Sequence, residues 1–236
     1  HMASHIEVNG ERLAFDAVVA NADYHHVETK LVPKNYQVYP ERYWRKKVLS
    51  PSAMLVYLGV SKKVPGLLHH TMFFDADWHG HFDQVFKKKE WSSRPLFYVA
   101  NPSKTDTTIA PKGYENIVLL APLANDLHPS PAQVDELVES LIARLESHTK
   151  TTINDALVVK KVVMMDFFAD TFNSYKGNAF GLAHTLGQSA LFRPRMQSRK
   201  LRNLFYVGQY TNPGTGVPMV ILSGKIAARV VGERIH

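Results

Sequence analysis

Short apolar stretches, separated by Pro, Gly, Asp and Ser, recur through the middle of the chain. They are rich in β-branched and aromatic residues, which favour strands over helices. This pattern predicts an antiparallel or mixed sheet. The predicted strands cover residues 53–60, 67–74, 96–99, 116–121 and 157–164.

The N-terminal part predicts a hairpin followed by a buried strand. Asn9-Gly10 is a type I′ turn signal between two flanking strands. Residues 13–21 change from alternation to a short apolar run, as in a strand that enters a buried sheet. Residues 25–50 lack sustained periodicity, so we expect a loop with one short helix at 40–47.

One long helix is predicted from its cap and its periodicity. Ser130, Pro131 and Gln133 match an N-cap serine, a proline at the first helical position and a capping-box glutamine. Apolar residues then recur at three- and four-residue intervals, which predicts a face packed on the sheet. They are Val134, Leu137, Val138, Leu141 and Leu145.

The last part of the chain predicts a strand at 204–208, a glycine-rich loop at 209–216 and a helix at about 217–231. A strand that passes through such a turn into a helix directs backbone N–H groups and the positive helix end at one place. This arrangement suits an anionic or electron-rich ligand.

Composition excludes some chemistries and leaves the partner open. None of the 236 residues is cysteine, which excludes disulfides, thiolate metal sites and cysteine nucleophiles. No apolar run reaches the roughly 18–20 residues of a membrane span. The net charge of +7 fits either solvated surface charge or a surface that contacts an anionic membrane. Nucleic acid is a third alternative, but no recognisable nucleic-acid motif accompanies the charge. The basic clusters are Arg42, Arg45, Lys46 and Lys47; Lys62 and Lys63; Lys87 to Lys89; and Arg193, Arg195, Arg199, Lys200 and Arg202.

The segment from Asn203 to Ala228 carries the most specific pattern. Its strand and Val-Gly, its Thr-x-Pro-Gly-x-Gly-x-Pro turn and its helix with Ser-Gly and Ala-Ala resemble the C-terminal signature of the phytoene dehydrogenase family. These proteins are FAD-dependent carotenoid desaturases. The resemblance extends over nearly residues 10–232, in the family's order, through 16–23, 50–59, 69–74, 98–106, 110–113, 177–181, 188 and 192–194.

The resemblance implies that this signature faces the pyrimidine edge of a flavin. Gly208 would let the backbone approach the cofactor, and a helix that begins near Val217 would direct N–H groups at the edge that gains negative charge on reduction. No catalytic residue is identified and no metal ligand is expected. The expected cofactor-binding residues are Gly208, Gln209, Thr211, Gly214, Thr215, Gly216, Val217 and Pro218.

The resemblance also implies an α/β fold with two interleaved parts. One is a partial FAD-binding, Rossmann-like domain at 5–24 and 195–236. The other is a substrate-binding domain at 25–194, with a mixed or antiparallel sheet and helices. The chain begins with His-Met-Ala-Ser at residues 1–4. A residue before the first methionine is typical of an expression-tag scar. The incomplete parallel sheet would leave an exposed edge and an apolar face, which favours a homo-oligomer.

One part of the family pattern is missing. The Gly-x-Gly-x-x-Gly turn that cradles the FAD pyrophosphate does not occur in this sequence. We therefore expect the C-terminal half of such an enzyme, separated from its N-terminal FAD-binding segment. We expect it to bind FAD weakly or not at all and to be inactive alone.

The implied reaction is the desaturation of a long apolar polyene, a carotenoid precursor, by hydride transfer to FAD. Such a substrate lies in lipid, so we expect a cytoplasmic enzyme at the membrane periphery, with the basic clusters and Trp44, Trp78 and Trp91 at the surface. Two alternatives stay open: a ketolase, isomerase or saturase on the same scaffold, and a cofactor-free module that binds a lipid or a protein partner. Nucleic acid is not an expected partner.

Several other side chains are candidates for chemistry. Arg193-Pro194 either fixes the loop beside the flavin or contacts a ligand. The histidine pairs lack a visible third and fourth metal ligand, so we expect surface or loop histidines. The carboxylates that we consider for proton handling, each more simply structural, are Asp23, Asp106 and Asp166; the histidines are His25, His26, His69, His70, His79 and His81.

Overall fold

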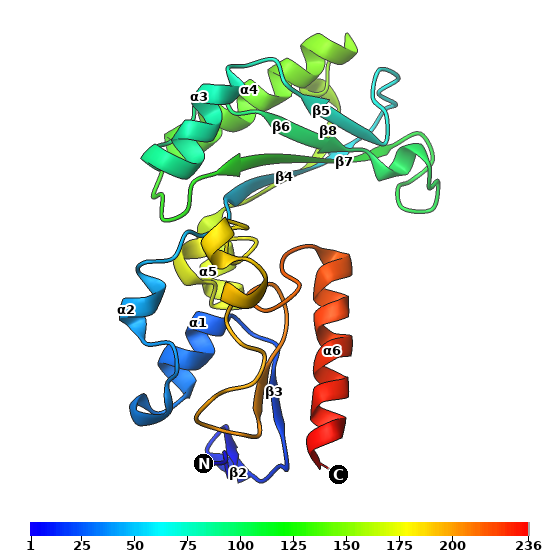
Figure 1. Ribbon diagram of the computed structural model, residues 1–236. Helices are drawn as coiled ribbons and strands as arrows, with labels where there is room; N and C mark the ends of the chain where they lie inside the picture. The colour runs from blue at the N-terminus through cyan, green and yellow to red at the C-terminus, as the bar shows by residue number, and fades with distance from the viewer. Residues whose placement is uncertain (236) are drawn as a thin grey trace. The chain divides into compact units, whose positions relative to one another are not determined.

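The computed structural model describes residues 1–235, which form two compact units (Figure 1). Unit 1 comprises residues 1–50 together with the chain from residue 168 onward, and unit 2 comprises residues 51–167. The substrate-binding domain expected at 25–194 is longer than unit 2 at both ends. Residues 25–50 and 168–194 belong to unit 1 because Trp44, Leu49 and Leu182 pack in one core with Leu204 and Tyr206. Which segments contact a substrate stays a prediction.

Unit 2 is built on a five-stranded antiparallel sheet in the order β5–β6–β7–β4–β8. The antiparallel alternative of the prediction is therefore confirmed. Side chains of β7 alternate between buried and half-buried along its length, because successive residues of a strand point to opposite faces. The strands are β4 (Ser52–Val60), β5 (His70–Phe73), β6 (Phe97–Ala100), β7 (Glu115–Leu123) and β8 (Leu157–Val163).

Helix α4 (Pro131–Thr149) covers one face of this sheet (Figure 1). The predicted capping box is present: the Ser130 side chain accepts from the Gln133 backbone N–H, and the Gln133 side chain accepts from the Ser130 N–H. The apolar face of the helix is buried against the sheet, at Leu137, Val138, Leu141, Ile142 and Leu145.

Unit 2 also holds a helical segment that the sequence did not predict. Helix α3 (Trp78–Phe82) continues into a π-helical turn at Asp83–Lys88. The segment is short, contains Gly80 and lacks the sustained periodicity of α4, so its pattern gave no helix signal. Helix α5 (Met165–Phe172) leads the chain back to unit 1.

Unit 1 contains the predicted hairpin and a parallel strand pair. β1 (Ile6–Val8) and β2 (Glu11–Leu13) are joined by Asn9 and Gly10, both with positive φ, which confirms the type I′ turn. β3 (Val18–Ala20) pairs in parallel with β9 (Leu204–Tyr206). The predicted C-terminal helix is α6 (Val217–Ile235).

The segment after β3 is more helical than predicted. The short helix expected at 40–47 is present as α2 (Glu41–Trp44), but α1 (Tyr24–His26), a π-helical turn (Val27–Leu31) and a 3-10 turn (Lys34–Tyr36) precede it. Asp23 caps α1, because its carboxylate accepts from the His26 N–H.

The three tryptophans do not form a common surface. The expectation for Trp44 was wrong: its side chain is 1% exposed, and its indole N–H donates to the Tyr39 carbonyl. Trp91 packs against the core of unit 2, whereas Trp78 is 53% exposed. Within residues 1–235, no helix is long and apolar enough to cross a bilayer.

Candidate functional site

The candidate site is the glycine-rich turn between β9 and α6. Gly208, Gly214 and Gly216 have φ values of 100°, 125° and 112°, which side chains other than glycine rarely adopt. A Cβ on Gly208 would meet only the Asn21 side-chain oxygen, at 3.6 Å, so the backbone is open at this position. The three glycines therefore give the turn a shape that other residues would strain.

Two hydroxyl groups tie the start of the turn to the helix. The Ser223 Oγ accepts from the Gly208 N–H at 3.1 Å and lies 2.9 Å from the Thr211 Oγ1. The Thr211 hydroxyl also lies 3.1 Å from the Gly208 carbonyl, and this side chain is 0% exposed. Thr211 thus acts inside the turn. Ser223 was part of the recognised pattern, but its contact with Gly208 was not predicted.

The second half of the turn contacts residues that were not predicted from the sequence to belong to the site. A Cβ on Gly214 would lie 2.5 Å from the His184 ring, so only glycine fits. The Thr215 hydroxyl donates to the Phe180 carbonyl. Gly216 has nothing within 4 Å of a Cβ, and its carbonyl accepts from the Val220 N–H.

Arg193 fixes the turn from the side. Its guanidinium donates to the carbonyls of Gln209 at 2.7 Å and of Leu182 and Gln188 at 3.3 Å. The side chain is buried. Of the two roles considered for the Arg-Pro pair, the structure therefore places Arg193 in the first, as the residue that fixes the loop.

A hollow of about 510 Å³ opens beside this turn, at the carboxyl ends of both parallel strands. Asn21 and Ala22 follow β3, and Gly208 and Gln209 follow β9. Ligands of parallel α/β sheets bind at this end of the strands. Of the eight expected cofactor-binding residues, Gly208 and Gln209 line the hollow. The other six lie farther along the turn, at Thr211, Gly214, Thr215 and Gly216, or at the start of α6, at Val217 and Pro218.

Asp23 lies in the same hollow and is held by hydrogen bonds. Its carboxylate accepts from the Tyr210 hydroxyl at 2.7 Å and from the backbone N–H groups of His26 and Tyr175. Burial and the neighbouring Asp23 carboxylate raise the pKa of Tyr210 well above its usual value, so this phenol stays protonated. These contacts give Asp23 a structural role in the hollow.

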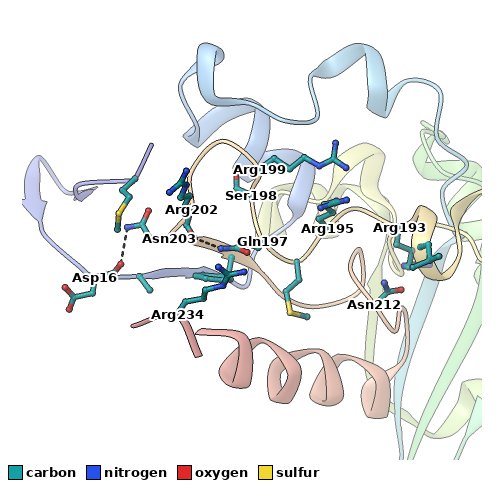
Figure 2. A pocket seen from close by; sticks show the side chains of 15 residues that line it. Asp16, Arg193, Arg195, Gln197, Ser198, Arg199, Arg202, Asn203, Asn212 and Arg234 are labelled. Carbon is teal, nitrogen blue, oxygen red and sulfur yellow. Dashed lines mark hydrogen bonds between the residues drawn. The ribbon is translucent and has the colours of Figure 1, made fainter. Parts of the chain in front are cut away.

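The C-terminal basic cluster forms a second hollow, of about 920 Å³ (Figure 2). It runs from Asp16 and Asn203, at the amino ends of β3 and β9, to Arg193. Figure 2 shows arginines on the loop before β9 and a further arginine from the end of α6. Among the described residues, Asp16 is the only carboxylate in its lining, so the hollow suits an anionic group. The arginines are Arg193, Arg195, Arg199, Arg202 and Arg234.

The remaining candidates are not among the residues that line either hollow. Asp106 is exposed and accepts from the Thr108 backbone and hydroxyl, and Asp166 is also exposed. His69 and His70 contact the Thr105 and Tyr98 hydroxyls. No cluster of three or more metal-ligating side chains is present in the part of the chain that the structure describes.

Comparison with known proteins identifies the family to which this chain belongs. The model of the flavin containing amine oxidoreductase family matches residues 4–232. The chain belongs to this family.

Curated relatives narrow the resemblance to carotenoid desaturases and confirm the predicted group. The chain is 39% identical to the carotenoid 3,4-desaturase of Haloarcula japonica over 97% of the chain and 46% of that protein. It is 34% identical to the zeta-carotene-forming phytoene desaturase of Myxococcus xanthus over 96% of the chain and 43% of that protein. It is 32% identical to the lycopene-forming phytoene desaturase of Pantoea ananas, over 98% and 48%. The chain thus spans about half the length of these relatives.

A solved structure supports the fold. An oxidoreductase from Methanosarcina mazei superposes with a TM-score of 0.55 at 12% identity, over 97% of this chain and 46% of that one. The likeness shows a shared mixed α/β fold.

The family implies FAD in its full-length enzymes, so the donors that the turn offers are compared with the needs of a flavin ring. The first N–H groups of an α-helix have no intrahelical partner, and in α6 these include the exposed residues Val217 and Met219. Pro218 has no N–H to offer. Together with the open backbone at Gly208, this donor set suits the ring edge that gains negative charge on reduction.

Proposed function

We propose that the turn from Gly208 to Pro218 binds the ring edge of FAD and that the chain supplies this part of a carotenoid desaturase. The observation that carries the proposal is the open glycine backbone at the carboxyl ends of β3 and β9. The relatives named above support the reaction class. In this proposal unit 1 provides the flavin-facing segment.

When bound, FAD would supply the hydride acceptor for the desaturation, in which one substrate carbon loses a hydride and the neighbouring carbon loses a proton, so that the bond between them becomes a double bond. The residues of this chain would bind and orient. Val217 and Met219 would donate backbone N–H groups toward the ring edge. Ser223, Thr211 and Arg193 would hold the turn in shape, since their polar groups already bond its backbone.

Unit 2 would bind the polyene. An apolar cavity of about 230 Å³ is lined by strands β5, β6 and β7 and by the helical segment 78–88. Its walls are almost entirely hydrocarbon, which matches an apolar chain and leaves little for a polar metabolite to bind.

A membrane surface is the proposed source of the substrate. Trp78 and Phe82 are exposed on α3, and Lys87 to Lys89 follow on the same segment. Exposed aromatic residues beside lysines fit an anionic lipid surface, so we place the enzyme at the periphery of the cytoplasmic membrane. The outer edge of β3 would pair with a further strand, from the N-terminal FAD-binding segment or from a second copy.

Titration with lumiflavin and FAD tests the proposed site. Lumiflavin contains the ring without the ribityl chain and phosphates. Because this sequence lacks the phosphate-binding turn, we expect both ligands to bind weakly, with dissociation constants within about threefold of each other. Isothermal calorimetry measures both. Purified chain that retained stoichiometric FAD, or that failed to bind lumiflavin, would contradict the proposal.

The apolar cavity also favours a second candidate, a cofactor-free module that binds a lipid. The same titration separates the two. Binding of an apolar polyene by a chain that gives no calorimetric signal with lumiflavin would support the module.

A further inference from the structure

The arginine hollow of unit 1 holds positive charge that carboxylates of the described chain do not balance (Figure 2). Four of its five arginines are exposed, and within residues 1–235 none of these four forms an ion pair. Exposed guanidinium groups contribute little to the stability of a fold. The fifth, Arg193, is buried and fixes the glycine-rich turn. The exposed side chains available to a ligand are Arg195, Arg199, Arg202 and Arg234.

The backbone of the loop before β9 is fixed, so its arginines are held near one another. The Met196 carbonyl accepts from the Tyr206 N–H at 2.7 Å. At Arg195, the carbonyl accepts from the Tyr24 hydroxyl at 2.9 Å, and the N–H donates to the Tyr39 hydroxyl at 3.1 Å. Like charges in a fixed loop repel, and a bound anion relieves that repulsion. Because the loop is already ordered, binding costs little conformational entropy.

A second element, α6, adds a positive charge from another direction. Arg234 lies near the C-terminal end of α6 and lines the hollow together with the arginines of the loop. Arg229 lies on the same helix, but it bonds Glu233 and is not part of the lining. The volume of about 920 Å³ is within the range of small-molecule sites, roughly 300–1,000 Å³. Cations from two elements therefore border one space large enough for a ligand.

The kind of cation indicates the kind of anion. All five cationic side chains in the lining are arginines. A guanidinium presents its N–H groups in a planar fork that matches two oxygens of a phosphate or a carboxylate, whereas a lysine is a point charge. A phosphomonoester has three acceptor oxygens and nearly two negative charges at neutral pH, so several guanidiniums can share it. A carboxylate has one charge and two oxygens, which a single fork occupies.

We infer that the arginine hollow binds a phosphomonoester group. Its lining shares no residue with the hollow at Gly208 or with the cavity of unit 2, so the inference is independent of the proposed flavin and polyene sites. The phosphates of FAD form a pyrophosphate diester without a terminal phosphate, which matches this site less well. Two sources carry the required group: a soluble phosphate ester and the headgroup of phosphatidic acid in a bilayer.

Methyl phosphate and dimethyl phosphate test the inference on the whole chain. They differ by one methyl group, but the first is a monoester and the second is a diester with a single charge. We expect methyl phosphate to bind about tenfold more tightly at neutral pH, because it offers one more charge and one more acceptor oxygen to the guanidiniums. ¹H–¹⁵N NMR titration measures both affinities. Equal affinities, or no binding of methyl phosphate, overturn the inference.

The variants Arg234→Gln and Arg229→Gln form a matched pair on α6. Both side chains are exposed, so neither change should prevent folding. We expect Arg234→Gln to weaken methyl phosphate binding by about fivefold, and Arg199→Gln/Arg202→Gln by about tenfold or more. Arg229→Gln should change it by less than about twofold. Unchanged affinity in both Arg234→Gln and Arg199→Gln/Arg202→Gln overturns the inference.

Vesicle sedimentation distinguishes the two sources of the phosphate. Phosphatidylcholine vesicles with and without phosphatidic acid are compared, in the presence and absence of methyl phosphate. Sedimentation that requires phosphatidic acid and is inhibited by methyl phosphate supports the inference and identifies the lipid headgroup. Methyl phosphate binding without sedimentation supports it and identifies a soluble ester. Failure of both overturns it, while lumiflavin binding in the same preparation separately tests the flavin site.

Discussion

The two hollows of unit 1 lie at opposite ends of the same pair of strands, β3 and β9, and the residues that line them differ in charge. The hollow at the carboxyl ends of β3 and β9 is lined by the backbone around Gly208, by polar side chains such as Asp23 and Asn178, and by apolar side chains such as Phe168 and Phe172. Among the described residues, five arginines and one carboxylate line the hollow that starts at the amino ends. The five arginines lie outside the turn at 209–216, although Asn212 of that turn also lines their hollow.

In the proposed function, backbone shape and not side-chain charge marks the flavin-facing end of the sheet. The flavin ring gains only a delocalised charge on reduction, which helix N–H groups can meet. Exposed arginines suit phosphates or anionic lipid. Arg193 links the two regions, because it lines the arginine hollow while its guanidinium bonds the Gln209 carbonyl.

Arg193→Met should have the largest effect. It removes the donors to two buried carbonyls and one partly buried carbonyl, so we expect a loss of about 4 kcal/mol in the free energy of unfolding. Urea denaturation measures it. Arg195→Met is the control, since Arg195 is exposed in the same Arg-Pro-Arg segment, and its change should stay below about 0.5 kcal/mol. Equal losses in the two variants would contradict the role given to Arg193.

Gly214→Ala should be the next most damaging change. A Cβ there meets the His184 ring at 2.5 Å, in a backbone conformation that alanine disfavours. We expect about 2–3 kcal/mol of destabilisation, with weaker lumiflavin binding. Gly216→Ala has the backbone strain without the contact and should cost about 1 kcal/mol. If calorimetric unfolding shows Gly216→Ala to be the more damaging variant, the contact that we assign between His184 and Gly214 is contradicted.

Ser223→Ala tests the tie between helix and turn. It leaves the Gly208 N–H without its acceptor and should destabilise the chain by about 1–2 kcal/mol. Ser189→Ala serves as control, because that hydroxyl bonds an exposed carbonyl. Amide hydrogen exchange should accelerate at Gly208 in Ser223→Ala alone. Unaltered exchange at Gly208 would contradict the hydrogen bond that we assign to the Ser223 hydroxyl.

The double variant Arg199→Ser/Arg202→Ser should have the smallest effect on the flavin-facing turn. Both side chains are exposed in the arginine hollow, so lumiflavin affinity should change by less than about twofold. Retention on anionic phospholipid vesicles should fall and become less sensitive to salt. A large loss of lumiflavin affinity would contradict this prediction and would indicate that the flavin ring binds near the arginines.

Local signals predicted much of the fold. Asn9-Gly10 predicted its hairpin, Ser130 and Gln133 predicted the cap of α4, and β-branched runs predicted the five strands of unit 2, because each feature depends on neighbours in sequence. The C-terminal signature predicted the turn and α6.

Features that depend on distant contacts were not predicted. Trp44 was expected at a surface but is buried, since Tyr24 and Tyr210 pack around its ring. The fit of His184 under Gly214 joins residues thirty positions apart. Periodicity cannot report such contacts, because it describes one element at a time.

The most direct test of the central claim is a ¹H–¹⁵N NMR titration of the chain with lumiflavin. Assigned amide signals of the turn and of the arginine hollow report the two regions in one experiment. The account predicts shifts at Gly208, Gln209, Val217 and Met219, with Arg199 and Arg202 unchanged. Shifts concentrated at Arg199 and Arg202, or no shifts in the turn at saturating lumiflavin, would contradict it.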